Sequence, residues 1–447
     1  MKLIYEPRMF DYMMESVDRD RMVIATYYVE DVRDENEFID HFKQIERMAL
    51  EGSTSSWMEV PDDTADVRER LTSRVLGYYE VPAPKGTKKA VVQLGFPIGA
   101  WDVNVNVPML LLSIAGNFSA FPTKTRLLDV VIPKKVADEF QGPKFGVEGL
   151  RAHLGIEKRP LLMHIIKPKM GMTPQQTADQ VYQTGIGGAD VAKDDEMCSE
   201  LEICPFDARV EAVMKAVDRV YQETGRKMLY LVSITDEVDR INEKARRAIE
   251  MGANGLLLAY SAGFSALRVL TNDPKVNVPV LLHVSHMLPL LPVINFPVLA
   301  KIGRLCGADF MLTPTQWSSL QVASLEETLR VNQILHAPFF HIKQTMPNPA
   351  AGIYPGAVPV LMQDMGPDIL ISAGGGMLGH PMGYSAGAKA FRQAIDATMD
   401  DIPLQQAAKD KPELMAALET WGVRERPFTP WGYAGPNYHP KIAPKNI

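Results

Sequence analysis

Eight short apolar runs between residues 161 and 376 constrain the fold of this chain more than any other feature of its sequence. Stretches with helical spacing of apolar residues lie between them, such as 173–185 and 206–225. Because parallel strands need crossover connections, this alternation favours a closed (β/α)8 TIM barrel over an open sheet. The runs are LLMHIIKP (161–168), ADVAKDD (189–195), MLYLVSIT (228–235), GLLLAY (255–260), PVLLHVS (279–285), DFMLTP (309–314), FFHIKQT (339–345) and DILISAGGG (368–376).

The segments on either side of the barrel follow other patterns. From about residue 20 to 145, a strand (MVIATYYV), an acidic helix and further extended segments predict an α+β domain of the ferredoxin-like kind. After residue 400 there is one short helical pattern and then a proline-rich tail. We therefore predict an N-terminal α+β domain (1–145), an α/β barrel (146–400) and a C-terminal helical extension with its tail (401–447).

Composition excludes several classes of protein. Hydrophobic residues make up 46% and charged residues 23% of 447, as in folded globular proteins. The net charge is −7 without a basic block, so nucleic acid is not an expected partner. No apolar run is long enough to span a membrane. Cys198, Cys204 and Cys306 lack metal-ligand spacing, and we interpret them as reduced thiols of a cytoplasmic protein.

Polar clusters follow the first two runs, at the end of a barrel where catalytic groups gather. IIKPK places Lys167 and Lys169 after the first, and AKDDE places Lys193, Asp195 and Glu196 after the second. Each cluster alone is as typical of a solvated loop. However, carboxylates are oxygen ligands suited to Mg2+. A lysine beside them forms an ion pair unless CO2 converts it to a carbamate, which would be a third anionic ligand.

Glycines follow the last two runs. Gly374 and Gly375 begin GGGMLGHPMG, and Gly352 lies in PAAGIYPG. Glycine lets backbone N–H groups approach an anion closely, and barrels often bind phosphate at these loops. The alternative is an ordinary tight turn.

Taken in order, QGPKFGVEGLR, IIKPKMG, GGADVAKDDE and GGGMLGHPMG resemble the large subunit of RuBisCO over about residues 25 to 400. The resemblance implies that Lys193 is carbamylated and that it holds Mg2+ together with Asp195 and Glu196. It also implies that Lys167 exchanges a proton with the substrate enediolate, with Lys169 as its neighbour.

The same resemblance implies a shared active site. Its phosphate-binding glycines would be Gly352, Gly374 and Gly375. The segments EGSTSSW and AGNFSAF match parts of the family that reach into the partner subunit, so we expect at least a homodimer. The residues concerned are Glu51, Ser56, Trp57 and Asn117.

Departures from the family argue against CO2 fixation. Ser285 stands at the position of a catalytic histidine, His286 at that of a phosphate-binding arginine, and Leu312 at that of another histidine. The loop TQWSSLQVASLEE lacks the lysine that orients CO2 in carboxylases, so the electrostatic stabiliser of carboxylation is missing. His286 stays a candidate substrate contact, and we expect a substrate with one phosphate.

Three functions remain open. The first choice is a Mg2+-dependent decarboxylase of a phosphorylated 3-oxo sugar acid, because such a reaction needs no base to begin. The alternative is an isomerase or tautomerase, such as an enolase of a methylthio-sugar phosphate. The enolases of methionine salvage have a lysine base where this chain has Asn117, which cannot remove a carbon-bound proton. A regulatory protein is disfavoured by the intact lysine and carboxylates. His283, His286 and His341 are further candidate acid–base groups.

Overall fold

The computed structural model describes residues 18–32, 41–54, 60–100, 105–117, 124–317 and 323–425. The chain forms two compact units. Unit 1 contains 1–142, 286–306 and 338–342, and unit 2 contains 143–285, 307–337 and 343–447. The domain limits at residues 145 and 400 stay predictions. None of the described helices is long and apolar enough to cross a membrane.

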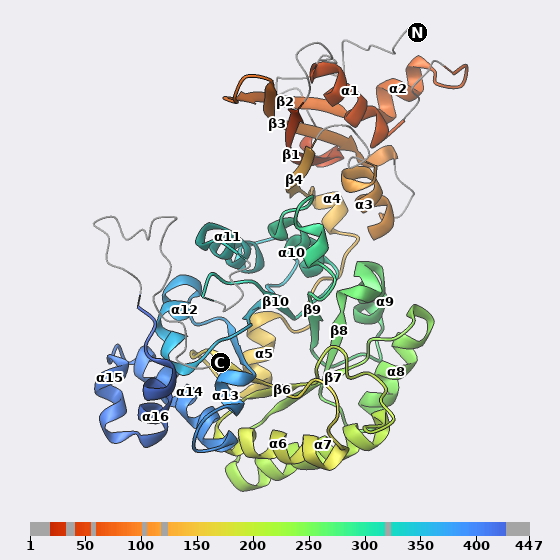
Figure 1. Cartoon of the computed structure of the whole chain (residues 1–447). Coiled ribbons are helices and arrows are strands. Elements are labelled where there is room, and N and C mark those ends of the chain that lie inside the picture. Colours follow the sequence, from red (N-terminus) through yellow and green to blue (C-terminus); the bar gives the residue numbers. More distant parts are fainter. Residues whose placement is uncertain are drawn as a thin grey trace. The chain divides into compact units, whose positions relative to one another are not determined.

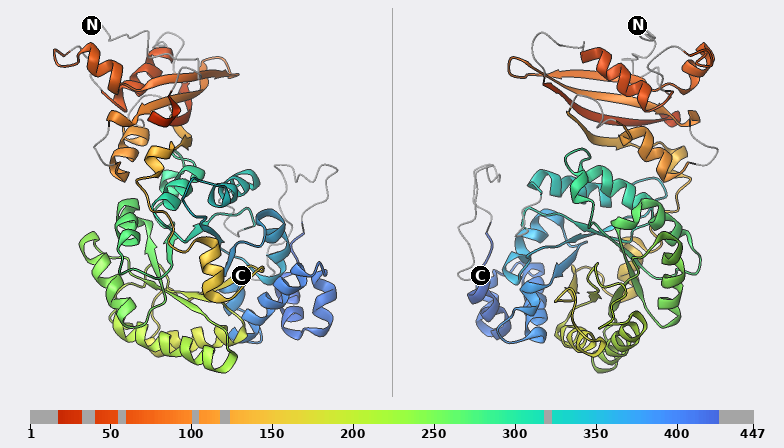
Figure 2. Two further views of the ribbon diagram at one scale, coloured as in Figure 1. Left: turned by 180° about the vertical axis from the view of Figure 1, so that it is seen from behind. Right: turned by 45° about the vertical axis from the view of Figure 1, so that its right-hand side comes forward.

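Unit 1 is built on a four-stranded antiparallel sheet in the order β2-β3-β1-β4. This order, with α1 between β1 and β2 along the chain, is that of a ferredoxin-like fold and confirms the α+β prediction. Helix α1 packs against β2 and β3 (Figure 2). The elements of this unit are β1 (Met22–Val32), α1 (His41–Glu51), α2 (Ala65–Leu71), β2 (Arg74–Val81), β3 (Thr87–Pro97), α3 (Val107–Ala115), β4 (Lys124–Val131), α4 (Lys134–Ala137) and α10 (Phe296–Leu305).

Unit 2 contains eight parallel strands surrounded by helices, so the barrel prediction is confirmed (Figure 1). The strands are β5 (Leu161–Ile165), β6 (Val191–Lys193), β7 (Leu229–Ser233), β8 (Gly255–Ala259), β9 (Val280–His283), β10 (Phe310–Thr313), β11 (Met346–Pro349) and β12 (Leu370–Ala373). The helices are α5 (Gly146–Leu154), α6 (Pro174–Gly187), α7 (Phe206–Thr224), α8 (Val238–Glu250), α9 (Gly263–Asn272), α11 (Leu325–His336), α12 (Val358–Met365), α13 (Gly375–Leu378), α14 (Tyr384–Met399), α15 (Leu404–Ala407) and α16 (Pro412–Trp421).

The predicted seventh strand, 339–345, is wrong. In the structure this segment is a turn: Ile342 N–H donates to the Phe339 carbonyl, and Phe340 has a left-handed φ of 51°. The strand is instead β11, whose sequence MPNP contains two prolines and therefore reads as a loop. Hydrogen bonding to β10 makes it a strand, because Met346 N–H donates to the Asp309 carbonyl.

The barrel closes between β11 and β12, the two ends of the hydrogen-bonded strand order. Pro347 and Pro349 have no N–H, so β11 has few backbone donors to offer a neighbour. The side chain of Asn348 supplies one instead: its Nδ2 lies 2.6 Å from the carbonyl oxygen of Leu370, and it also contacts Ser372 Oγ. An asparagine side chain thus bridges this seam of the barrel.

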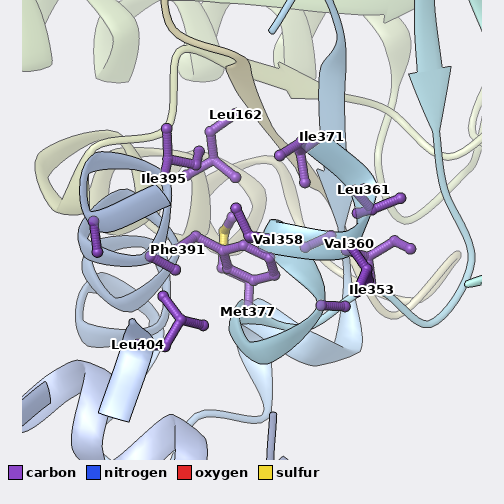
Figure 3. Packing of buried hydrophobic residues seen from close by; sticks show 14 of the residues in the cluster. Leu162, Ile353, Val358, Val360, Leu361, Ile371, Met377, Phe391, Ile395 and Leu404 are labelled. Atoms are coloured by element: carbon purple, nitrogen blue, oxygen red, sulfur yellow. The ribbon is translucent and has the colours of Figure 1, made fainter. Parts of the chain in front are cut away.

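Alternate residues of each strand divide between two cores, as the two-residue period of a strand requires. Leu161, Met163 and Leu370 belong to the cluster shared by all eight strands, in the barrel interior. Leu162 and Ile371 belong to a second cluster with side chains of α14, such as Phe391 (Figure 3). The helices therefore cover the outer face of the strands.

Helix α6 shows how sequence sets these contacts. A capping box of Thr173 and Gln176 begins it, and Gly188 ends it with a left-handed φ of 116°. At Gly187, a Cβ atom would lie 2.2 Å from the carbonyl oxygen of Ser385 in α14. The approach of the two helices therefore requires glycine at this position.

Candidate functional site

The predicted cluster around Lys193 forms at the carboxyl end of β6. Lys193 is the last residue of the strand, and its side chain is 1% exposed. Its Nζ lies 2.9 Å from the Asp194 carbonyl oxygen and 3.6 Å from Glu196 Oε2. Asp195 is equally buried at 1%. The structure thus brings the lysine and Glu196 together at the end of the strand, with Asp195 between them in sequence.

Lysines from the end of β5 contact both carboxylates. Lys167 Nζ lies 2.6 Å from Asp195 Oδ2, a short charge-assisted contact. Lys169 Nζ lies 3.4 Å from Glu196 Oε1, and this lysine is about half exposed. The two strand-end clusters predicted separately from sequence therefore form one site.

His283, the last residue of β9, extends the site. Its Nε2 lies 3.3 Å from Glu196 Oε2. Its Nδ1 accepts the backbone N–H of Ser285 at 3.2 Å and lies 2.9 Å from Ser285 Oγ. Because Nδ1 accepts, the ring hydrogen of the neutral imidazole is on Nε2 and points to Glu196. Ser285 thus orients His283.

Burial and neighbouring charges set the ionisation of these groups. Burial lowers the pKa of Lys193, which favours the neutral amine over the ammonium. Burial alone would raise the pKa of Glu196, but His283, Lys193 and Lys169 together lower it to about 2. Burial, followed by the charge of Lys193, lowers the pKa of His283 to about 3. A carboxylate and a neutral imidazole therefore face each other at neutral pH.

The donor set fits a Mg2+ site completed by a carbamate. Within the described ranges, His, Cys, Asp and Glu side chains form no group of three or more that could hold a metal ion. The two carboxylates would therefore need a further ligand of another kind. Asp195 and Glu196 offer hard oxygen atoms, and Mg2+ prefers such donors. CO2 adds to the neutral form of an amine, and burial favours that form of Lys193. Lys193 is therefore suited to supply the third oxygen ligand as a carbamate.

Of the predicted phosphate-binding glycines, Gly374 borders this cluster. A Cβ atom on Gly374 would lie 3.4 Å from Lys167 Cγ, so the loop after β12 adjoins the first lysine. A Cβ on Gly376 would lie 2.1 Å from the carbonyl oxygen of Ile353, which places that loop against the loop after β11. Gly352 has a left-handed φ of 72°, and Gly375 has open space where a side chain would be.

Other predicted residues lie in unit 1 or outside the described ranges. Glu51 and Asn117 contact each other, with Asn117 Nδ2 2.9 Å from Glu51 Oε1. His286 is exposed, with a left-handed φ of 72°, and His341 Nε2 lies 2.8 Å from the Phe140 carbonyl oxygen. Ser56 and Trp57 lie outside the described residues.

Sequence reasoning missed the buried network that holds the AKDDE loop. Asp194 accepts hydrogen bonds from Tyr230 OH at 2.5 Å, Ser233 N–H at 3.0 Å and Arg209 Nε at 3.2 Å. Arg209 is fully buried. Asp194 therefore anchors the loop between the two flanking site residues. A charged residue directly after a buried strand was the only signal, and it did not identify the partners.

Comparisons with known proteins agree with this geometry. The family model of the ribulose bisphosphate carboxylase large chain matches residues 146–421 with its catalytic domain and 11–136 with its N-terminal domain. The chain belongs to the RuBisCO large-chain family. Within that family it is a RuBisCO-like protein, as its relatives indicate.

Two relatives and one solved structure show how similar this chain is to other members of the family. A "ribulose bisphosphate carboxylase-like protein" of Archaeoglobus fulgidus is 37% identical over 422 residues, covering 91% of this chain and 94% of the relative. A 2,3-diketo-5-methylthiopentyl-1-phosphate enolase of Bacillus licheniformis is 34% identical, with 90% and 98% covered. The octameric RuBisCO of Pyrococcus horikoshii has a TM-score of 0.84 at 29% identity, with 94% and 98% covered.

Proposed function

We propose that this chain catalyses the enolisation of a phosphorylated ketone, as an isomerase or tautomerase that does not fix CO2. The observation that carries the proposal is the contact between Lys167 Nζ and Asp195 Oδ2 beside the buried Lys193. Relatives named as enolases support this reaction over the decarboxylation favoured by the sequence alone. The missing loop lysine supports the exclusion of carboxylation.

The residues of the site have distinct roles in the proposed reaction. Lys193 as a carbamate, Asp195 and Glu196 would hold Mg2+, which when bound polarises a carbonyl group and stabilises the negative charge of an enolate. Lys167 moves the proton, because its Nζ reaches the edge of the carboxylate cluster while its side chain is still about a third exposed. His283 keeps Glu196 in place through its Nε2–H.

The substrate is expected to carry one phosphate. Gly352, Gly374 and Gly375 would receive it through backbone N–H groups, and the loop positions beside Lys167 support that assignment. Unit 1 is proposed to complete the site of a partner subunit through Glu51, Ser56, Trp57 and Asn117. The octameric assembly of the Pyrococcus horikoshii enzyme supports a dimer-based oligomer.

Decarboxylation of a phosphorylated 3-oxo acid stays a second candidate because of Asn117. Its amide is bonded to Glu51 and is no base, so a reaction that starts with proton removal has to use another group. Loss of CO2 from a β-keto acid yields the same enolate without that step. Lys167 would then donate the proton that completes the product.

Solvent deuterium distinguishes the two reactions. The protein, with Mg2+ and bicarbonate, is given phosphorylated diketones and 3-oxo acids in D2O, and NMR and CO2 release are followed. Deuterium incorporation without CO2 supports the isomerase, whereas CO2 release with deuterium at the carbon that carried the carboxylate supports the decarboxylase. Lys167→Met should abolish either signal, and Lys158→Met, at an exposed lysine before β5, should retain it. Full turnover by Lys167→Met refutes the proposed role.

A further inference from the structure

A single side chain of helix α6 binds both backbone groups of Lys167. Gln180 Oε1 accepts the Lys167 N–H at 3.1 Å, and Gln180 Nε2 donates to the Lys167 carbonyl oxygen at 2.8 Å. Strand β5 ends at Ile165, and the Ile166 N–H donates to the Lys193 carbonyl oxygen at 3.2 Å. Lys167 is therefore held from the helix one residue beyond that contact between strands. Because both hydrogen bonds come from one planar amide, they fix the position and the orientation of the Lys167 backbone.

Further polar side chains continue from this amide into the buried layer between β5 and α6. His164 Nε2 lies 3.0 Å from Gln180 Oε1, and Thr184 Oγ1 lies 3.0 Å from His164 Nδ1. His164 and Thr184 are 0% exposed, and Gln180 is 4% exposed. Leu162, two residues before His164 on the same face of β5, fills the outer layer of the barrel with an apolar side chain. Because buried polar groups cost free energy unless they are hydrogen-bonded, packing alone does not explain this polar chain.

The contacts with Lys167 set the direction of the hydrogen bonds in this chain. An amide oxygen only accepts, so His164 Nε2 carries the ring hydrogen and donates it to Gln180 Oε1. Burial lowers the pKa of His164 to about 3, so the imidazole is neutral and its Nδ1 faces Thr184 as an acceptor. If the oxygen and nitrogen of the Gln180 amide were exchanged, donors would face donors at both His164 and Lys167. The imidazole therefore holds the amide in the orientation that the Lys167 backbone requires.

We propose that Gln180 is a positioning residue for Lys167 in the proton transfer at this site. This role rests on the proposed function, in which Lys167 moves the proton. The Lys167 side chain extends from the backbone that Gln180 holds, and its Nζ reaches Asp195 Oδ2 at 2.6 Å. Lysine has a long, flexible side chain, so anchoring its backbone limits the positions that the amine can take. His164 and Thr184 act through Gln180, since they lie behind it in the buried layer.

The test compares Gln180→Met with the wild type in the D2O assay for deuterium incorporation. Methionine is close to glutamine in length and volume, but it binds neither backbone group of Lys167. We expect kcat to fall on the order of 10- to 100-fold, because a small displacement of a reacting group slows the reaction strongly. KM should change little, because the glycines proposed to bind phosphate belong to other loops. A raised KM with unchanged kcat overturns the proposal.

The same substitution on the exposed face of α6 provides a matched control. Gln175 Nε2 lies 2.7 Å from Asp179 Oδ1, and Gln175→Met removes this contact. It should leave both kcat and KM as in the wild type. Rates are referred to the folded fraction of each variant, measured by circular dichroism, so that a loss of stability alone does not register as a loss of kcat.

Thr184 provides a second test if Gln180→Met does not fold. Thr184→Val keeps the shape of the side chain and removes the hydroxyl that faces His164 Nδ1, whereas Thr184→Ser keeps that hydroxyl. We expect kcat to fall in the valine variant and to recover in the serine variant. Full kcat in Thr184→Val, or a serine variant as slow as the valine variant, overturns the proposal.

Amide hydrogen exchange separates the positioning role from the proposed function, because it needs no substrate. The Lys167 N–H is bonded to Gln180 in the wild type, so it should exchange faster in Gln180→Met, while the amides of β8 keep their rates. Unchanged exchange at Lys167 overturns the positioning role. A wild type that converts neither phosphorylated ketones nor 3-oxo acids, but shows the faster exchange in Gln180→Met, refutes the proposed function and leaves the contact established.

Discussion

Replacing Asp194 with asparagine should cost about 3 kcal/mol of stability, although this residue is not itself a proposed metal ligand. Asparagine keeps the shape but loses the charge and one acceptor oxygen. It leaves the guanidinium of Arg209, which is fully buried, without its carboxylate. An –NH2 group would also face either Tyr230 or the donors of Arg209 and Ser233.

The magnitude follows from the contacts that remain. Breaking a buried ion pair by removing one partner costs about 3–5 kcal/mol. The lower end applies here, because Arg209 still donates to the carbonyl groups of Cys198, Ser199 and Cys204. Urea denaturation followed by fluorescence and circular dichroism measures the change in the free energy of unfolding.

Two further variants check the reasoning. The double variant Asp194→Asn/Arg209→Met should be more stable than Asp194→Asn alone, because it removes the unpaired charge and retains the volume. Glu211→Gln, which breaks an exposed pair with Lys215, should leave stability nearly unchanged. A cost below about 1 kcal/mol for Asp194→Asn, or no recovery in the double variant, would refute the account.

Three other predictions concern the scaffold. Burial raises the pKa of Asp309 to about 6 from 3.8 despite three backbone N–H donors. Its contribution to the free energy of unfolding is therefore fully present below pH 3.8 and is lost as pH rises through 6. That loss is about 3 kcal/mol, and Asp309→Asn should remove this slope from a plot of unfolding free energy against pH. Gly187→Ala should lower stability by about 1–3 kcal/mol in urea, because α14 lies too close, whereas Gly99→Ala, with open space, should not. Asn348→Leu should speed amide exchange in β12 relative to β7; equal exchange in the two strands would contradict the bridging role.

Most of the fold could be predicted from the sequence because the spacing of apolar residues and the residues that cap or end an element lie within that element's own stretch of chain. Helix α6 has its cap and its glycine within the same stretch, so 173–185 could be recognised without any partner. Strand β11 could not, because its two prolines argue against a strand and only pairing with β10 makes it one. The segment 339–345 has strand-like residues but turns at Phe340.

The site was predictable where family motifs mark it and not where packing assembles it. Lys167, Lys193 and Asp195 stand in two motifs, and in the structure Lys167 Nζ lies 2.6 Å from Asp195 Oδ2 while Lys193 and Asp195 are both buried. The contact of His283 with Glu196 depends on strand positions far apart in sequence. Sequence spacing alone carries no signal for such contacts.

The asparagine bridge at the last strand pair also bears on how the barrel assembles. Seven of the eight strand junctions are parallel ladders of backbone hydrogen bonds, whereas β11 and β12 are the ends of the ladder series. Such a barrel is a sheet that curls until its edges meet, and a side chain fastens it. New chain termini placed at the exposed Pro367 before β12, away from the glycine loop after β11, would leave every ladder intact, so we expect such a circular permutant to keep the barrel.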